Sequence, residues 1–234
     1  MGKIKGILFD KDGTLFGFDE TWSRWCADLI TDYSEGDART VAALADALMF
    51  DLERERFLAG SPVIAGTADV SAELMLPHLS GWTFETLLDD INRRAAAVEG
   101  VPPVALVPLM NTLRAAGHVL GVATNDAESS AHAQLLSAGI AEHMSFVAGY
   151  DSGFGAKPAP GMVTGFVAQT GLAADEVVMV GDSTHDLSAG RAAGTQTAGV
   201  LTGPASAEEL SPLADVVLPD IGALTEWLGI SAPA

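Results

Sequence analysis

Two carboxylates stand two residues apart in the segment Asp10-Lys11-Asp12-Gly13-Thr14, directly after a short apolar run. A carboxylate can attack phosphorus and form an aspartyl-phosphate. A second carboxylate close by can protonate the leaving oxygen and then activate a water molecule. Gly13 allows the chain to turn sharply after the run. This segment therefore supplies the residue types that cleavage of a phosphate ester requires.

Other polar residues that can do chemistry follow later apolar runs or precede a predicted helix. They are Thr124 and Asn125, Lys157, and Asp182 with Asp186. In an open α/β sheet, ligands bind beyond the carboxyl ends of the strands. We therefore expect carboxylates, a hydroxyl, an amide and a lysine to meet at one rim of a sheet.

A metal ion is the expected companion of this cluster. Carboxylates held close together repel one another unless a cation neutralises them, and a set of oxygen ligands favours a hard ion such as Mg²⁺. A lysine and a hydroxyl can bind phosphate oxygens and stabilise the transition state. The residue types thus predict Mg²⁺ and a small phosphorylated metabolite as ligands.

Short apolar runs supply the strands that position these residues. The runs cover residues 4–9, 118–123, 144–148, 177–180, 195–201 and 216–218. Runs without polar alternation are typical of strands buried on both faces of a parallel sheet. Helical patterns between the runs end at Gly117, Gly139 and Gly171, the usual position for a helix-ending glycine. The alternation predicts an α/β fold with a doubly wound, Rossmann-like parallel sheet.

The stretch from 18 to 98 interrupts this alternation directly after the first strand. Its apolar residues recur at helical spacing and no clear strand run appears. Prolines at 102 and 103 favour a stiff connector after it. We therefore expect an α/β core of residues 1–17 and 99–234, with residues 18–98 as an inserted, all-helical domain.

Composition limits the partners and the location of the protein. Its net charge of −19 makes nucleic acid and anionic membrane surfaces poor partners. Cys26 is its single cysteine, so no internal disulfide is possible. No signal-peptide core follows the N-terminus, and no apolar run reaches the ~18 residues of a membrane span. These features predict a cytoplasmic protein; they give no prediction of its oligomeric state.

The sequence resembles the haloacid dehalogenase superfamily, whose four motifs it carries in order. They are Asp10 to Leu15, Thr124 after an apolar strand, Lys157, and Gly181 to Asp186 continuing to Gly194. The first and fourth motifs are specific, and the other two count through their order and position. Among the subfamilies, the chain is similar to the phosphoglycolate phosphatases.

The resemblance implies a role for each motif residue. Asp10 would be the nucleophile and a Mg²⁺ ligand; Asp12 would be the general acid and base, with its backbone carbonyl on the metal. Thr124, Lys157 and the Asn125 backbone would bind the phosphoryl group, Asp182 would ligate Mg²⁺, and Asp186 would support the metal directly or through water. The helical insert is similar to the C1 cap of the family. The implied enzyme is a Mg²⁺-dependent phosphatase of a small phosphate monoester, such as 2-phosphoglycolate.

Two alternatives to this interpretation are disfavoured, and two others stay open. A dehalogenase would not need the acid at Asp12, and a phosphonate-cleaving relative would need a cap lysine, which the chain lacks between residues 12 and 156. A sugar phosphomutase of the β-phosphoglucomutase kind keeps the same core residues. From another class of protein, a catalytically silent scaffold on the same fold also remains.

Several nearby residues receive structural expectations instead. Lys11 is expected to point away from Asp10 and to have no catalytic role. The segment from Thr124 to Asp126 is expected to cap a helix, and His185 to start or pack one. Four arginines of the insert are expected on solvated helix faces, with one of them a candidate partner for a substrate carboxylate. They are Arg54, Arg56, Arg93 and Arg94.

Overall fold

A six-stranded parallel sheet forms the centre of the protein in a computed structural model that describes residues 3–230. In spatial order its strands are β5 (Met144–Ala148), β4 (Val119–Ala123), β1 (Gly6–Phe9), β6 (Val177–Gly181), β7 (Gln196–Val200) and β8 (Val216–Leu218). Central β1 is in register with both neighbours, so that Phe9 lies opposite Val122 and Val180. Every run predicted as a strand contributes one, and the expected α/β fold is confirmed.

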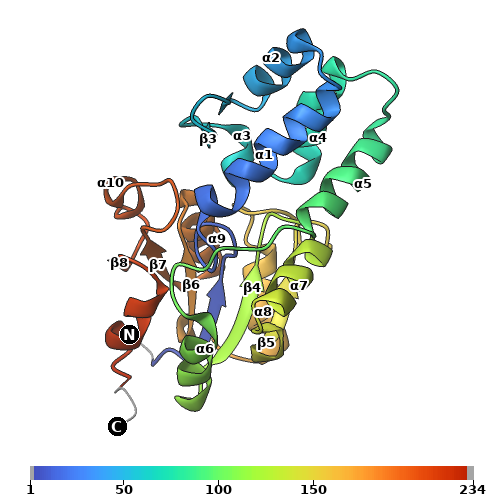
Figure 1. Ribbon diagram of the computed structural model, residues 1–234. Coiled ribbons are helices and arrows are strands. Elements are labelled where there is room, and N and C mark those ends of the chain that lie inside the picture. The colour runs from blue at the N-terminus through green and yellow to red at the C-terminus, as the bar shows by residue number, and fades with distance from the viewer. Residues whose placement is uncertain (1–2, 231–234) are drawn as a thin grey trace.

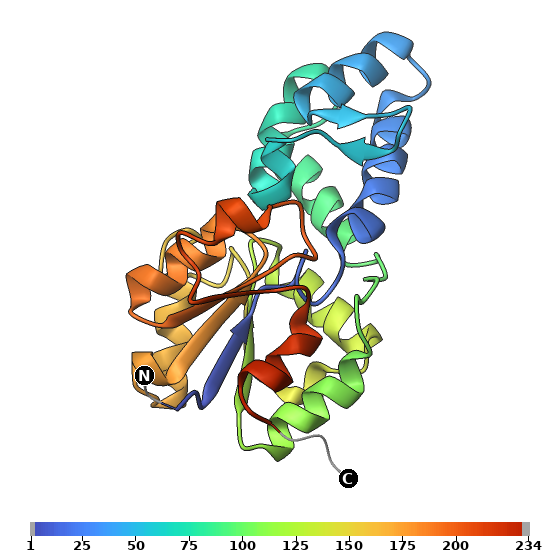
Figure 2. The ribbon, with the colours of Figure 1, turned by 90° about the vertical axis from the view of Figure 1, so that its left-hand side faces the viewer.

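Helices cover both faces of the sheet, as Figure 2 shows. One face packs against α6 (Leu106–Ala115), α7 (Glu128–Ser137) and α11 (Leu224–Trp227), and the other against α8 (Gly161–Thr170) and α9 (Thr184–Ala193). Side chains of β1 alternate between the two cores, with Ile7 and Phe9 in one and Leu8 in the other. Burial on both faces explains the continuous apolar runs in the sequence.

Residues 18–95 form a separate helical unit beyond one end of the sheet (Figure 1). It contains α1 (Phe18–Ser34), α2 (Ala38–Ala47), α3 (Pro62–Ala65), α4 (Ala68–Met75), the 3₁₀ helix η1 (Leu76–His78) and α5 (Phe84–Ala95). The unit buries a hydrophobic core of its own, which includes Trp22, Leu44 and Met75. The structure adds a feature that the sequence did not predict, a small antiparallel pair of β2 (Phe50–Asp51) and β3 (Arg56–Phe57).

The remaining short elements lie around the core sheet. They are η2 (Ala141–His143), η3 (Ala174–Glu176), α10 (Ala207–Leu210) and η4 (Ile221–Ala223). Two segments join the helical unit to the core and run side by side, because the Gly17 amide donates to the Val101 carbonyl at 2.8 Å. The Val101 amide in turn donates to the Thr21 hydroxyl at 3.1 Å. The chain therefore passes from the core to the helical unit and back at one place.

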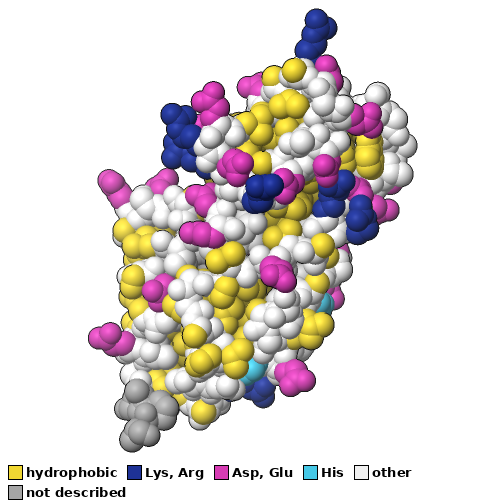
Figure 3. Space-filling model, in the orientation of Figure 1, with side chains coloured by type: hydrophobic (Ala, Val, Ile, Leu, Met, Phe, Trp, Pro, Cys, Tyr) yellow, Lys and Arg dark blue, Asp and Glu magenta, His cyan; other side chains and the backbone are white. Residues whose placement is uncertain are grey.

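Acidic side chains are scattered over both units on the face that Figure 3 shows. Lysine and arginine side chains on that face gather mainly on the helical unit, close to acidic neighbours. Among residues 3–230, no helix is both long enough and apolar enough to cross a membrane.

Candidate functional site

The loop after β1 brings the first motif into a tight turn. The Gly13 amide donates to the Phe16 carbonyl at 2.7 Å, and the Leu15 amide donates to the Lys11 carbonyl at 2.9 Å. Gly13 has a φ of 78°, and a Cβ built there would lie 2.3 Å from Oδ2 of Asp182. The position therefore requires glycine for two reasons: its backbone conformation and the close approach of the Asp182 carboxylate.

Three buried carboxylates meet at the rim of the sheet. Asp10, Asp182 and Asp186 each offer an oxygen, and these oxygens lie within 4.8 Å of one another. The ammonium of Lys157 lies 2.7 Å from Oδ1 of Asp10 and 2.6 Å from Oδ1 of Asp186. When all three carboxylates are ionised, this one cation leaves an excess of two negative charges. The set of oxygen donors and its residual charge thus fit a divalent ion of the Mg²⁺ type.

The pKa values follow from this crowding of charge. Burial, followed by the nearby Asp186 carboxylate, raises the pKa of Asp10 from 3.8 to about 7. Burial and the same neighbour also raise the pKa of Asp182 well above its usual range. Burial alone would lower the pKa of Lys157, but the charges of Asp10 and Asp186 raise it overall. Lys157 therefore stays protonated, and the excess negative charge of the three carboxylates favours the binding of a further cation.

Helix α9 positions Asp186 through a capping box. Ser183 precedes the helix, and its amide and hydroxyl donate to Oδ2 of Asp186 at 3.0 and 2.7 Å. One oxygen of Asp186 thus fixes the helix start, and the other faces Lys157. His185, the second residue of this helix, lines the same pocket, in agreement with its expected place at a helix start.

The second motif lies at the end of β4. The Thr124 hydroxyl accepts a hydrogen bond from the Asp126 amide at 3.0 Å. Helix α7 begins only at Glu128, and its cap residue Ala127 makes no side-chain hydrogen bond. The expectation that residues 124–126 cap the helix is therefore wrong, because the chain needs a further turn before the helix can start.

Asn125 holds the Lys157 segment in place. Its side-chain oxygen accepts from the Lys157 amide at 2.8 Å, and its Nδ2 donates to the Lys157 carbonyl at 2.9 Å. The same Nδ2 donates to the carbonyl of Ala65 in the helical unit, also at 2.9 Å. The side chain of Asn125 therefore links two parts of the site and reaches across to the helical unit.

Lys11 lies at the centre of a second charged network, which the sequence did not reveal. Its side chain is fully buried. Its ammonium lies 2.8 Å from Oδ1 of Asp12, 3.0 Å from Oδ2 of Asp126 and 2.6 Å from Oε1 of Gln134. No contact with the Asp10 carboxylate is among these. Burial alone would lower the pKa of Lys11, but the carboxylates of Asp12 and Asp126 raise it overall.

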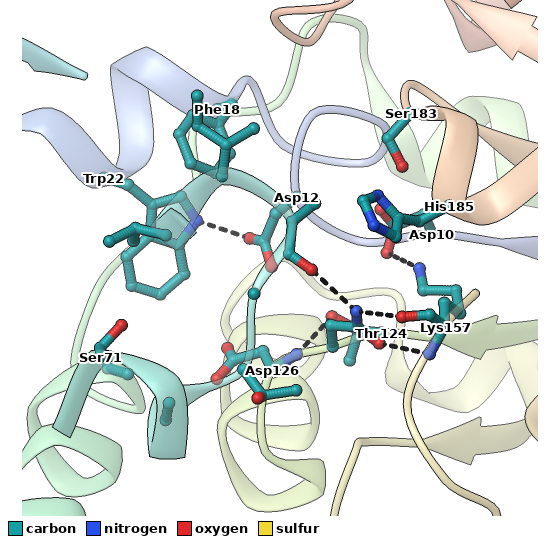
Figure 4. A pocket seen from close by; sticks show the side chains of 18 of the residues that line it. Asp10, Asp12, Phe18, Trp22, Ser71, Thr124, Asp126, Lys157, Ser183 and His185 are labelled. Carbon is teal, nitrogen blue, oxygen red and sulfur yellow. Dashed lines mark hydrogen bonds and ion pairs between the residues drawn. The ribbon is translucent and has the colours of Figure 1, made fainter. Parts of the chain in front are cut away.

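Asp12 receives a second donor from the helical unit. The indole N–H of Trp22 on α1 donates to Oδ1 of Asp12 at 2.7 Å, as the dashed line in Figure 4 marks. Burial raises the pKa of Asp12, and the neighbouring Lys11 ammonium opposes this rise. The carboxyl group of Asp12 thus lies outside the group of three carboxylates and in an environment of its own.

These residues line one pocket between the core and the helical unit. All seven sequence-predicted site residues line it: Asp10, Asp12, Thr124, Asn125, Lys157, Asp182 and Asp186. In Figure 4, Phe18, Trp22 and Ser71 of the helical unit lie opposite Lys157, Ser183 and His185 of the core. None of the four arginines considered from the sequence lines the pocket. Three of them pair instead with carboxylates of their own unit, as Arg54 does with Asp51 and as Arg93 and Arg94 do with Asp90.

The fold and the four motifs define a known class of enzyme. The family described as haloacid dehalogenase-like hydrolase matches residues 7–200, which is most of the chain. The chain therefore belongs to the haloacid dehalogenase-like hydrolase family, and the resemblance seen in its motifs is confirmed.

Several relatives are named as phosphoglycolate phosphatases. The phosphoglycolate phosphatase of Vibrio cholerae is 33% identical over 238 residues, an alignment that covers 99% of this chain and 100% of that protein. That of Rhodospirillum rubrum is 37% identical over 134 residues, which are 57% of this chain and 55% of that protein. The chain is accordingly an enzyme of the phosphoric monoester hydrolase class.

Solved structures show the same fold. CbbY from Rhodobacter sphaeroides, solved in complex with phosphate, has a TM-score of 0.72 to this structure and 20% sequence identity. The match covers 94% of this chain and 96% of that one. At this identity the likeness speaks for the fold alone.

Proposed function

We propose that the protein is a Mg²⁺-dependent phosphatase of a small phosphate monoester in the cytoplasm, and that it acts through an aspartyl-phosphate on Asp10. One observation carries this proposal. Two carboxyl groups enter one pocket from residues two apart, each with its own lysine, Lys157 beside Asp10 and Lys11 beside Asp12. One carboxylate is thereby placed among cation ligands, and the other is free to exchange a proton with the substrate.

The phosphoryl group has a set of partners around Asp10. The ammonium of Lys157, the hydroxyl of Thr124 and the backbone at Asn125 would hold its oxygens. Mg²⁺ would be held by Asp10, Asp182 and the Asp12 carbonyl, with support from Asp186, and would neutralise phosphate charge and orient the ester for attack. The excess negative charge of the three carboxylates supports this assignment.

The chemistry would proceed in two displacements. A carboxylate oxygen of Asp10 attacks phosphorus, the bond from phosphorus to the ester oxygen breaks, and Asp12 gives its proton to that oxygen, which departs as the alcohol. Asp12, now a carboxylate, takes a proton from water as that water attacks phosphorus. The bond from phosphorus to Asp10 then breaks, which releases inorganic phosphate and restores the Asp10 carboxylate.

The helical unit completes the proposed enzyme. We assign residues 18–98 as a cap domain on a core of residues 1–17 and 99–234. Its separate hydrophobic core and its paired connecting segments support this division. A cap over the pocket would exclude bulk water from the aspartyl-phosphate and would contact the leaving group.

Release of inorganic phosphate from a panel of phosphate monoesters tests the function. 2-Phosphoglycolate serves as the reference substrate, because relatives carry its name. We expect turnover with Mg²⁺ that is lost with EDTA, and no turnover by Asp10→Asn, whose fold should stay intact by circular dichroism. Asp89→Asn, at an exposed position of α5, serves as the control with normal activity. Wild-type-like rates from Asp10→Asn would refute the mechanism, and a phosphomutase would yield an isomerised sugar phosphate instead of free phosphate.

A further inference from the structure

The wall of the pocket that faces the phosphate site comes from the helical unit and is largely apolar, with Thr67 and Ser71 as its hydroxyl side chains. Phe18, Trp22 and Trp25 from α1 line it, together with Val63 and Ile64 from α3 and Ile91 from α5. The rings of Trp22 and Trp25 meet edge to face at 5.1 Å. Phe18 and Trp22 are buried. A leaving group that enters this wall would contact aromatic rings and branched side chains.

Charged side chains of the helical unit lie away from this wall. No lysine, arginine, aspartate or glutamate within residues 18–98, all of which the structure describes, lines the pocket. The unit has 15 aspartates and glutamates against six arginines, so its net charge also repels anions. The charged or titratable donors of the pocket, Lys157 and His185, both belong to the core side (Figure 4).

This arrangement disfavours a substrate with an acidic leaving group. A carboxylate buried against the wall would lose water and gain no cation from the helical unit, which is costly in free energy. An uncharged apolar group would instead replace water on apolar surface, which is favourable. The pocket should therefore discriminate between leaving groups by their polarity.

We propose that the substrate is a phosphate monoester of an uncharged, largely apolar alcohol, and that 2-phosphoglycolate is a poor substrate. This inference rests on the proposed phosphatase function and specifies its leaving group. The aromatic side chains would contact the leaving group, and Lys157 would hold the phosphoryl end common to all substrates.

Three phosphates test this proposal in the presence of Mg²⁺: benzyl phosphate, ethyl phosphate and 2-phosphoglycolate. Each releases an alcohol, so the apolar and charged character of the leaving group is what differs. We expect kcat/KM for benzyl phosphate to exceed that for ethyl phosphate by at least about tenfold. We expect it to exceed the value for 2-phosphoglycolate by about 10²-fold or more, because a charge is buried without a partner.

A pair of variants sharpens this test. Ile64→Arg places a cation on the apolar wall and should shift the preference toward 2-phosphoglycolate. Leu58→Arg places one at a position of the same unit that is 42% exposed and outside the pocket, and should leave the preference unchanged. A wild-type preference for 2-phosphoglycolate would overturn this inference and leave the phosphatase function standing. If none of the three esters is hydrolysed, both the phosphatase function and the inferred leaving group are refuted.

An independent observation concerns the orientation of Asp12. Oδ1 of Asp12 accepts from Lys11 at 2.8 Å and from Trp22 at 2.7 Å. Lys11 belongs to the core loop, whereas Trp22 belongs to the helical unit. With Oδ1 held by two donors, Oδ2 is the oxygen left to exchange a proton with the leaving group.

We infer that Trp22 is a positioning residue, which aligns the Asp12 carboxyl when the helical unit covers the core. Its loss should harm substrates in proportion to their need for a proton. An alkyl alkoxide leaves poorly without protonation, whereas p-nitrophenolate leaves readily.

Trp22→Phe removes the indole donor but keeps an aromatic wall, and Trp82→Phe, in the same unit but outside the pocket, is its matched control. We expect Trp22→Phe to lower kcat for benzyl phosphate by about tenfold or more, with much less effect on p-nitrophenyl phosphate. Trp82→Phe should not change the ratio between the two substrates. Equal losses of kcat on both substrates for Trp22→Phe would reduce Trp22 to a packing role and overturn the inference.

Discussion

Asp10 and Asp12 have different surroundings although only one residue separates them. Asp10 shares Lys157 with Asp186, whereas Asp12 shares Lys11 with Asp126. Each carboxyl group thus has its own local charge balance. Such separation allows one carboxylate to attack while the other carries a proton at the same pH.

Asp12→Asn tests the proton-transfer role at the scale of the residue. The amide keeps an oxygen that can accept from Lys11 and Trp22, so the loop should be preserved, but it cannot protonate the departing ester oxygen. We expect kcat for an alkyl phosphate to fall by ~10²-fold or more, with a smaller loss for p-nitrophenyl phosphate. Steady-state kinetics on both esters measure this difference. An unchanged rate with the alkyl ester would contradict the assigned role.

Lys11→Met tests the buried network. The substitution leaves Asp12 and Asp126 without their shared cation, and removal of one partner of a buried ion pair costs about 3–5 kcal/mol of unfolding free energy. Lys5→Met is the matched control, because Lys5 pairs with Glu176 at an exposed position, where a pair contributes about 1 kcal/mol or less. Urea unfolding of both variants compares the two losses. Similar small losses would show that the Lys11 network contributes little stability.

At the scale of residues, the sequence predicts the members of the site but not the environment of Lys11. Asp10, Thr124, Lys157 and Asp182 could be found because each follows or precedes a recognisable element, and the structure places all of them in one pocket. The environment of Lys11 could not be found. Its partner Gln134 is 123 residues away in the sequence, and only the packing of α7 against the core loop brings the two together.

At the scale of elements, burial decided what the sequence could show. The core strands are buried on both faces, so each appears as an apolar run. The pair of β2 and β3 has two residues in each strand, too few to give an alternating pattern. The start of α7 was missed because Thr124 and Asp126 resemble cap residues, while their hydrogen bonds close a turn before the helix begins.

Gly13→Ala tests the loop that brings the first motif to the fourth. Both Gly13 and Gly36 have positive φ, 78° and 84°, so alanine at either position should cost about 1 kcal/mol of stability. Only at Gly13 would the new Cβ collide with Asp182, whereas Gly36 has open space around it. We expect Gly13→Ala to lose activity by about 10²-fold, because the proposed metal ligand Asp182 is displaced. Gly36→Ala should keep its activity; equal activities would show that the contact with Asp182 is not needed.

At the scale of the whole molecule, the net charge of −19 opposes an anionic substrate at a distance. Attraction of the substrate must therefore arise within the pocket. Lys157 is the one lysine among the described residues that line it, and three carboxylates lie around its ammonium group. Without a further cation this pocket is itself unfavourable to phosphate. Metal binding and substrate binding should thus be coupled, since both depend on the same excess of negative charge.

The carboxylate cluster should also make the stability of the protein depend on pH and on a bound divalent cation. The pKa of Asp10 is raised from 3.8 to about 7 in the folded protein, so the folded state binds this proton more tightly than the unfolded chain. The contribution of Asp10 to stability is therefore most favourable at low pH and falls as the pH rises toward 7. A divalent cation binds the deprotonated group and stabilises only the folded state, so its effect should increase over the same range.

Thermal unfolding with and without saturating Mg²⁺ measures this linkage. We expect Mg²⁺ to raise Tm by more at pH 8 than at pH 6, because at pH 6 a proton competes for Asp10. Asp182→Asn should remove most of the Mg²⁺ effect, and the metal-free variant should melt above the metal-free wild type at pH 8, since one uncompensated buried charge is gone. Asp89→Asn, at an exposed position that does not line the pocket, should respond to Mg²⁺ as the wild type does. A shift in Tm that is equal at both pH values would mean that the metal does not displace a proton from this cluster.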